Sequence, residues 1–235
     1  MRAFGVARAE RASDAFDDIA GEYDRWVRIA VPTYEEVFRV ALEAIDHGSR
    51  VVGDVVDLGA GTGLFAARVA QHHPVAHYHL VDASTQMLEL ATSRFGALPA
   101  AATVRHQELE EFEGVDAYDI AISSFAIHHL EDEAKRRLFR AVHRSLRPGG
   151  VFVNVDQIRG DGQFAAMYWD RWLARVREAG GEEEQIASSE RRRHDHDRDS
   201  SLGEQLEWLQ QAGFEADCLY KHYFVGVFVG VKPER

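Results

Sequence analysis

Three glycines within five residues, directly after a short apolar run, constrain the fold of this chain more than any other feature. The run Val51–Leu58 is rich in β-branched residues, as a buried parallel strand is, and Gly59-Ala60-Gly61-Thr62-Gly63 stops it. Glycine permits both a tight turn and the close approach of a ligand to the backbone. The GxGxxG dinucleotide fingerprint needs a further glycine where Leu64 stands. A strand, a glycine turn and a following helix over 64–71 therefore predict an α/β sheet with a ligand at the turn.

The same alternation of short strands and longer amphipathic stretches continues to residue 155. Ser84 is placed to cap one of the intervening helices, and Pro148-Gly149-Gly150 follow the end of another, over 131–146. Each right-handed crossover between parallel strands needs a helix, so the order predicts a doubly wound parallel sheet whose ligand lies at the carboxyl ends of the strands. The further strands are expected at 77–82, 102–107, 118–123 and 151–155.

Additional segments flank this alternating part. Two helices are expected before it, over 16–29 and 34–45, and two more after it, over 164–179 and 202–212. The polar stretch 180–201 reads as a loop or mobile lid, and strands over 218–223 and 224–232 as a closing antiparallel hairpin. We therefore expect an N-terminal helical cap over 1–48 and a ligand-binding domain over 49–235, with 160–201 as a helical lid and loop insertion.

Composition excludes several classes of protein. The single cysteine, Cys218, excludes an intramolecular disulfide and a multi-cysteine zinc site. The formal net charge of −12 makes direct nucleic-acid binding unexpected without a local basic patch. No run of 18 uncharged apolar residues occurs, so we expect no membrane segment and a cytoplasmic protein. A homodimer stays open.

Four motifs together resemble the class I S-adenosylmethionine-dependent methyltransferases. The resemblance extends from about residue 16 to residue 232. It implies a mostly parallel, seven-stranded Rossmann-like methyltransferase sheet with a C-terminal antiparallel hairpin, and S-adenosylmethionine as the cofactor. The motifs are Asp57-Leu58-Gly59-Ala60-Gly61-Thr62-Gly63, Asp82, Ser123-Ser124-Phe125-Ala126-Ile127-His128-His129-Leu130, and Leu146-Arg147-Pro148-Gly149-Gly150.

This resemblance also implies roles for individual residues on the cofactor side. Asp82, which ends the second strand, is expected to bind the ribose hydroxyls, and Ser123 to line the methyl donor. Tyr23 is expected to close over the cofactor carboxylate, while Gln107 or Glu108 meets the adenine amino group. The methionine part is assigned to Asp57, Gly59, Ala60, Gly61 and Gly63, and the adenine surroundings to Ala83 and Met87.

The acceptor side is predicted from side-chain chemistry. His128 and His129 follow the fourth strand, where either could act as a base or orient the acceptor; the alternative is that they line and pack the pocket without titrating. Aromatic residues could wall the acceptor or simply form core, and Arg193 belongs to a triple-arginine run that could hold an anion or lie in a solvated loop. His194 to Asp197 has irregular spacing for a metal, so none is predicted. The substrate-binding candidates are Trp26, Tyr34, Tyr168, Trp169 and Arg193.

These expectations define one principal function and two alternatives. The principal one is methyl transfer to a small-molecule acceptor by in-line displacement, for which positioning supplies most of the rate. Phe16-Asp17, Val31-Pro32 with Tyr34, and the tail around Phe224 also resemble the carboxy-S-adenosylmethionine synthases of tRNA wobble-uridine modification. Those enzymes carry Gly-Cys-Ser-Leu-Gly where this chain has Gly-Ala-Gly-Thr-Gly, and they lack the double histidine. A non-catalytic cofactor-binding regulator is the second alternative.

Overall fold

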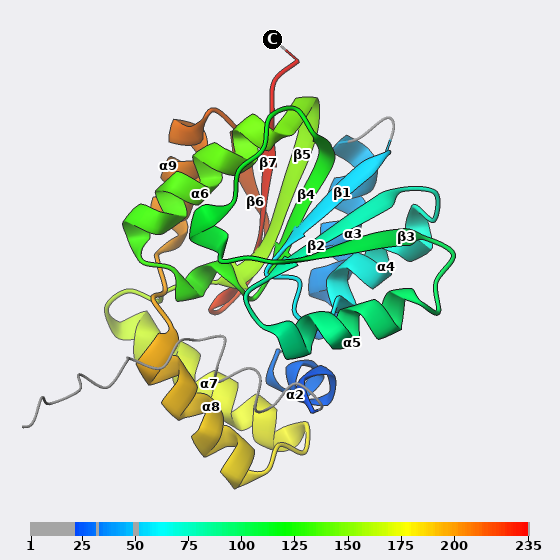
Figure 1. Ribbon diagram of the computed structural model, residues 1–235. Coiled ribbons are helices and arrows are strands. Elements are labelled where there is room, and N and C mark those ends of the chain that lie inside the picture. Colours follow the sequence, from blue (N-terminus) through cyan, green and yellow to red (C-terminus); the bar gives the residue numbers. More distant parts are fainter. Residues whose placement is uncertain (1–21, 32, 49–51, 235) are drawn as a thin grey trace, which may run out of the picture.

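The computed structural model describes residues 22–31, 33–48 and 52–234, and within them a seven-stranded sheet forms the centre of the molecule (Figure 1). The strand order is β3-β2-β1-β4-β5-β7-β6, and all neighbouring pairs are parallel except those made by β7. The predicted doubly wound sheet with a closing antiparallel hairpin is confirmed. The strands are β1 (Asp54–Leu58), β2 (His77–Asp82), β3 (Ala101–His106), β4 (Tyr118–Ser124), β5 (Leu146–Gln157), β6 (Glu215–His222) and β7 (Val225–Val231).

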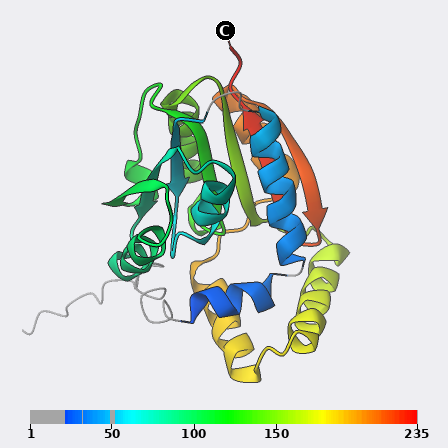
Figure 2. The ribbon, with the colours of Figure 1, turned by 90° about the vertical axis from the view of Figure 1, so that its right-hand side faces the viewer.

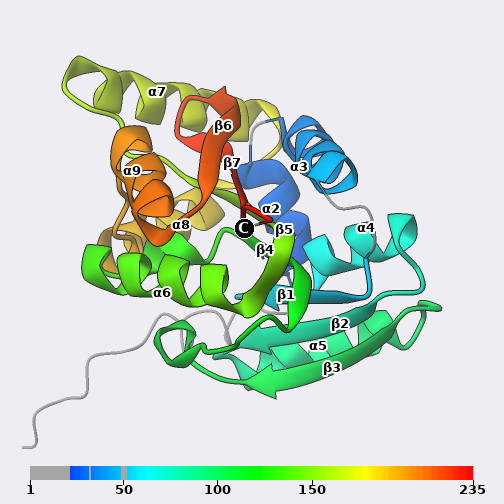
Figure 3. The same cartoon turned by 90° about the horizontal axis from the view of Figure 1, so that it is seen from above.

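Helices cover both faces of this sheet, as parallel strands require. Seen from above in Figure 3, α6 and α9 lie on one side and α3 and α4 on the other. Each side has its own apolar core, one including Phe38, Phe65 and Phe95, the other Phe139 and Phe152. The helices of these two layers are α3 (Tyr34–Gly48), α4 (Leu64–His72), α5 (Thr85–Phe95), α6 (Asp132–Ser145) and α9 (Leu202–Ala212).

Three further helices lie beyond the carboxyl ends of the parallel strands. They are α2 (Tyr23–Ala30), α7 (Gln163–Glu178) and α8 (Glu183–His196), and Figure 2 shows α2 lying across the base of the sheet beside the other two. The indole N–H of Trp172 in α7 donates to the carbonyl of Ala30, 2.7 Å away, which fixes the end of α2 against α7. Residues 16–21 of the first predicted helix and Pro32 lie outside the described residues.

The segment 180–201 was expected to be a loop or mobile lid, and the loop is wrong for most of it. Helix α8 occupies 183–196 and begins with a reciprocal capping pair: Glu182 accepts from the backbone of Gln185, whose side chain accepts from the Glu182 N–H. Only Ile186 of α8 is buried, so no helical period of apolar residues marks this helix in the sequence.

The α7–α8 segment begins and ends at neighbouring points beside the carboxyl end of β5, an inner strand of the sheet. The backbone N–H of Arg159, just after β5, donates to the carbonyl of Ser200, just before α9, at 2.9 Å. The side-chain amide of Gln205 adds bonds to the carbonyls of Gln157 and Ser200 at 2.9 and 3.2 Å. None of the described helices has an apolar stretch long enough to cross a lipid bilayer.

Candidate functional site

The glycine turn joins β1 to α4 through a left-handed backbone conformation that is energetically unfavourable for residues with a Cβ. Gly59, Gly61 and Gly63 have φ values of 71°, 53° and 72°, in the left-handed region that favours glycine. A Cβ on Gly59 would lie 2.2 Å from the Cβ of Ala126, whereas one on Gly61 would meet nothing within 4 Å. Gly59 is therefore required by packing, and Gly61 leaves an open approach to the backbone.

A cavity of about 580 Å³ lies against this turn, at the carboxyl ends of β1, β2 and β4. Its position is the one predicted from the parallel sheet, where ligands bind outside the carboxyl ends of the strands. The sequence-predicted residues that line it are Tyr23, Tyr34, Gly59, Ala60, Gly61, Asp82, Ala83, Met87, Glu108 and His129.

Asp82 connects the glycine turn to the helix that follows β2. One of its carboxylate oxygens accepts from the backbone N–H of Gly61 at 2.7 Å, and the other from that of Ser84 at 2.8 Å. Ser84 in turn caps α5, as predicted, by accepting from Met87 N–H at 3.0 Å. These backbone bonds hold the Asp82 carboxylate at the end of β2, where Asp82 lines the cavity.

Asp57 lies behind the turn rather than on the cavity wall. Its side chain is 1% exposed, and neither oxygen has a hydrogen-bonding partner in the described part of the chain. Burial, and to a smaller extent the negative charge of Asp82, raises the pKa of Asp57 to about 8; the nearby Ala66 backbone N–H, which makes no hydrogen bond of normal geometry to either oxygen, offsets only part of this. A buried carboxyl without a partner favours a cationic group in the adjoining space.

Besides Asp57, three of the predicted cofactor residues do not line this cavity. Gly63 starts α4 and packs against Ala91. The Gln107 amide donates to the carbonyl of Glu111, so of the predicted pair only Glu108 faces the cavity. Ser123 is fully buried and donates to the carbonyl of Leu58 at 2.7 Å, and its neighbour Ser124 lines the cavity instead.

A second, smaller cavity of about 120 Å³ lies between the end of β4 and the α7–α8 pair. The predicted residues Trp26, Trp169 and Arg193 line it, and the ring of Trp169 stacks on Trp172 at a centroid distance of 4.7 Å. Four residues line both cavities, so the two spaces are neighbours. They are Tyr23, Val27, Phe125 and His129.

Two aromatic predictions need correction. Tyr168 lines neither cavity, because its hydroxyl accepts from the ammonium of Lys221 at 2.9 Å and its ring packs beside Tyr223. Tyr34 lines the larger cavity and not the smaller one.

His128 is held in a buried network that the sequence did not predict. Its Nδ1 lies 2.6 Å from an oxygen of Asp156, and its backbone N–H donates to the other oxygen of that carboxylate at 3.0 Å. Burial alone would lower the pKa of His128, but the carboxylates of Asp156 and Asp197 outweigh it and raise this pKa to about 10. The network thus favours positive charge beside the smaller cavity.

His129 faces both cavities from the same short 3-10 helix, η2 (Ile127–His129). Its Nδ1 lies 3.1 Å from Asp197, and burial together with the neighbouring His128 lowers its pKa. Asp156 could have been found from the sequence, since it is the acid at the carboxyl end of the fifth strand. Asp197 could not, because it stands in a long charged run.

Helix α2 is fixed to the glycine turn by Asp24. One oxygen of Asp24 accepts from the Thr62 hydroxyl at 2.6 Å, and the other pairs with the guanidinium of Arg94. Arg94 also donates to the carbonyl of Thr62 at 2.8 Å. These contacts place Tyr23 and Val27 over the larger cavity.

The strand order with its single reversed strand, the glycine turn after β1 and the carboxylate at the end of β2 define the class I methyltransferase fold. Comparison of the sequence with protein families agrees: the model of the methyltransferase domain family matches residues 55–150. The chain therefore contains a class I S-adenosylmethionine-dependent methyltransferase domain.

Curated relatives resemble only part of the chain. An uncharacterized methyltransferase of Exiguobacterium sibiricum is 31% identical over 147 residues, which are 62% of this chain and 66% of that protein. Malonyl-[acyl-carrier protein] O-methyltransferase 1 of Ilyobacter polytropus is 25% identical over 141 residues, covering 60% of this chain and 50% of that protein. The chain matches between 26% and 66% of the length of these and similar relatives.

Solved structures share the fold over most of the chain. The DhpI–SAM–HEP complex aligns with a TM-score of 0.67 and 20% identity, over 97% of this chain and all of that one. A methyltransferase solved with the Trm112 activator of Haloferax volcanii aligns with a TM-score of 0.62 and 19% identity, also over 97% of this chain. At these identities the likeness concerns the fold.

Proposed function

We propose that this protein transfers a methyl group from S-adenosylmethionine to a small-molecule acceptor. The observation that carries the proposal is the pair of neighbouring cavities, one against the glycine turn and one against the α7–α8 pair, with His129 lining both. When bound in the larger cavity, the cofactor would supply a sulfonium methyl group: an acceptor lone pair would bond to the methyl carbon in line as the sulfur–carbon bond breaks and S-adenosylhomocysteine leaves.

The residues at the glycine turn fit this cofactor. The unpartnered carboxyl of Asp57 favours a cationic group such as the α-ammonium, and the open side of Gly61 admits a ligand close to the backbone. The carboxylate of Asp82 lines the same cavity as an acceptor suited to the ribose hydroxyls, and Ala83 and Met87 also line this cavity. The cavity of about 580 Å³ is within the usual size of a cofactor site.

The residues of the smaller cavity fit a small acceptor. Trp26 and Trp169 supply flat apolar walls, and the Arg193 guanidinium lies 5.6 Å from the centre of the Trp169 ring. With a volume of about 120 Å³, this space suits one group of a compact molecule and not a folded macromolecule. His128 and His129 are placed on the acceptor side of the site.

Isothermal titration with S-adenosylhomocysteine tests the cofactor assignment. Asp82→Ala is expected to weaken binding at least about tenfold, because a charged acceptor of hydrogen bonds is lost. Glu89→Ala, on the exposed side of α5, is the matched control and is expected to bind as the native chain does. Equal affinity for the native chain and Asp82→Ala would refute the assignment.

Native mass spectrometry of the freshly purified protein distinguishes the alternatives. Release of S-adenosylmethionine or S-adenosylhomocysteine supports methyl transfer and calls for an acceptor screen. A ligand heavier by one carboxylate would instead indicate the carboxy-S-adenosylmethionine branch. Tight cofactor binding with no turnover of any acceptor class would favour the non-catalytic regulator.

A further inference from the structure

Three potential metal ligands from distant parts of the sequence meet at the boundary of the two cavities. His128 and His129 come from η2 after β4, and Asp197 follows the last residue of α8. One Asp197 oxygen lies 3.1 Å from Nδ1 of His129 and 3.5 Å from Nε2 of His128. The side chains of His128, His129 and Asp197 are only 5%, 16% and 9% exposed.

These separations fit a shared metal ion. Two ligand atoms that each lie about 2.1 Å from a metal are about 3.0 Å apart at a right angle and about 3.4 Å apart at the tetrahedral angle. The two histidine–carboxylate distances, 3.1 and 3.5 Å, are therefore close to the ligand–ligand distances of a normal coordination sphere. All three ligand atoms lie within 4.8 Å of one another.

A buried carboxylate orients the His128 ring, as an outer carboxylate often does for a metal-bound histidine. Its Nδ1 is 2.6 Å from the buried Asp156, an outer carboxylate that fixes the ring and directs Nε2 toward Asp197. The amide nitrogen of Gln157 lies 2.9 Å from that Nε2 and 3.0 Å from Asp197, so this amide occupies the space beside both atoms. A metal ion would replace the Gln157 contact.

The local charge also favours a cation. Asp156, Asp197 and Asp199 gather around the cluster, and the Arg193 guanidinium pairs with Asp199 and lies 4.0 Å from Asp197. Two imidazoles with one carboxylate suit Zn²⁺, Fe²⁺, Mn²⁺ or Co²⁺, whereas Mg²⁺ and Ca²⁺ prefer ligand sets made of oxygen.

We propose that His128, His129 and Asp197 bind a divalent transition-metal ion whose open positions face the acceptor cavity. That these residues bind a metal ion is inferred from this geometry alone. That the metal ion binds the acceptor rests also on the proposed methyl transfer. Three protein ligands leave at least one position open, and all three residues line the smaller cavity. An oxygen, nitrogen or sulfur atom of the acceptor could bind there beside the cofactor.

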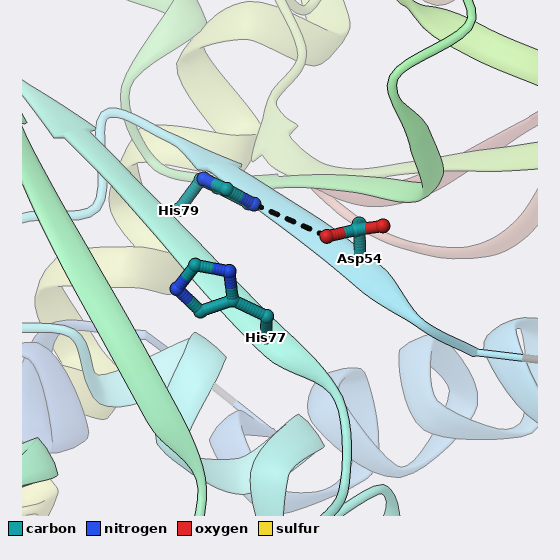
Figure 4. Close-up of side chains that lie close together, drawn as sticks. All are labelled: Asp54, His77 and His79. Atoms are coloured by element: carbon teal, nitrogen blue, oxygen red, sulfur yellow. Dashed lines mark hydrogen bonds and ion pairs between the residues drawn. The ribbon is translucent and has the colours of Figure 1, made fainter.

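A second trio with similar chemistry lies elsewhere and serves as the control. Asp54 on β1 and His77 and His79 on β2 lie side by side (Figure 4). They line neither cavity, and the Asp54 carboxylate is already paired with Arg147 at 3.0 Å. Replacing His77 and His79 by alanine removes this trio and leaves the proposed site intact.

The test measures Co²⁺ binding to untagged protein by equilibrium dialysis and visible absorption. His77→Ala/His79→Ala is expected to retain about one Co²⁺ per chain, and the further change His129→Asn to lose it. Asp156→Asn, which alters only the outer carboxylate, is expected to weaken binding by about 10–100-fold. Azide is expected to shift the Co²⁺ absorption bands, because it occupies an open position.

Several outcomes would overturn the proposal. Absence of Co²⁺ binding, or binding unchanged by His129→Asn, would eliminate the site, and a spectrum insensitive to azide would eliminate the open position. Circular dichroism and S-adenosylhomocysteine titration of each variant show whether it is folded. Normal cofactor binding without metal would refute this inference and leave the proposed function standing, whereas metal binding without cofactor binding would do the reverse.

Discussion

At the scale of the residue, Gly59 is the position where backbone conformation and packing combine. Gly59→Ala places a Cβ at a φ of 71° and 2.2 Å from the Cβ of Ala126. The left-handed conformation costs about 1–2 kcal/mol and overpacking about 1–3 kcal/mol. We expect the free energy of unfolding in urea to fall by about 2 kcal/mol or more.

Gly203→Ala is the matched control for that experiment. Gly203 lies in the first turn of α9, where an added Cβ meets nothing within 4 Å. Alanine in a helix is favoured over glycine by up to about 1 kcal/mol, so this variant should be as stable as the native chain or slightly more stable. If Gly59→Ala and Gly203→Ala had the same free energy of unfolding, the close contact described between Gly59 and Ala126 would be refuted.

Asp57 makes cofactor affinity depend on pH. Its folded-state pKa of about 8 lies above that of the unfolded chain, so ionisation costs stability as pH rises through 8, and the neutral form dominates at lower pH. Since only the ionised carboxylate pairs with a cationic ligand, S-adenosylhomocysteine affinity should rise from pH 6 to 8, by at most about tenfold per unit. In Asp57→Asn this dependence should be absent from titrations over the same range.

Residue positions along β4 show where sequence reasoning reached its limit. The glycine turn and Asp82 follow from chain order, because the carboxyl ends of parallel strands meet. Ser123 and Ser124 are chemically identical neighbours, and successive side chains in a strand point to opposite faces. Which of the two faces the cavity depends on the register with β5, and no single sequence contains that register.

At the scale of the element, helix α2 depends on one carboxylate. Asp24 accepts from Thr62 and pairs with Arg94, so Asp24→Ala should release the start of α2 from the glycine turn. We expect faster amide hydrogen exchange in α2 and several-fold weaker S-adenosylhomocysteine binding. Glu36→Ala removes an exposed, solvent-screened ion pair on α3 and should change neither.

The helices differ in how far the sequence could predict them. Apolar residues at helical spacing predicted α7 and α9 to within about two residues, because those helices bury Trp172, Val176, Trp208 and Leu209. Helix α8 buries only Ile186 and is charged elsewhere, so its sequence has the composition of a loop. Its stability comes from capping and from tertiary contacts such as the pair Arg177–Glu183 across the preceding turn.

At the scale of the whole molecule, cofactor binding should stabilise the fold. A ligand that binds only the folded state adds about 2.7 kcal/mol at a concentration 100 times its Kd. For a chain of this size, each kcal/mol corresponds to about 2–4 °C in Tm. Scanning calorimetry with S-adenosylhomocysteine should therefore show a rise of about 5–11 °C, and Asp82→Ala, whose affinity is at least about tenfold weaker, should show about half that rise or less at the same concentration.

The α7–α8 pair also has a consequence for how such proteins diversify. Because Arg159 and Ser200 are hydrogen-bonded neighbours, the intervening 40 residues form an excursion that returns to its origin. A segment joined in this way can be exchanged for one of different length without altering the strand order. New acceptors can then arise by grafting, while the ancestral cofactor half of the molecule is inherited unchanged.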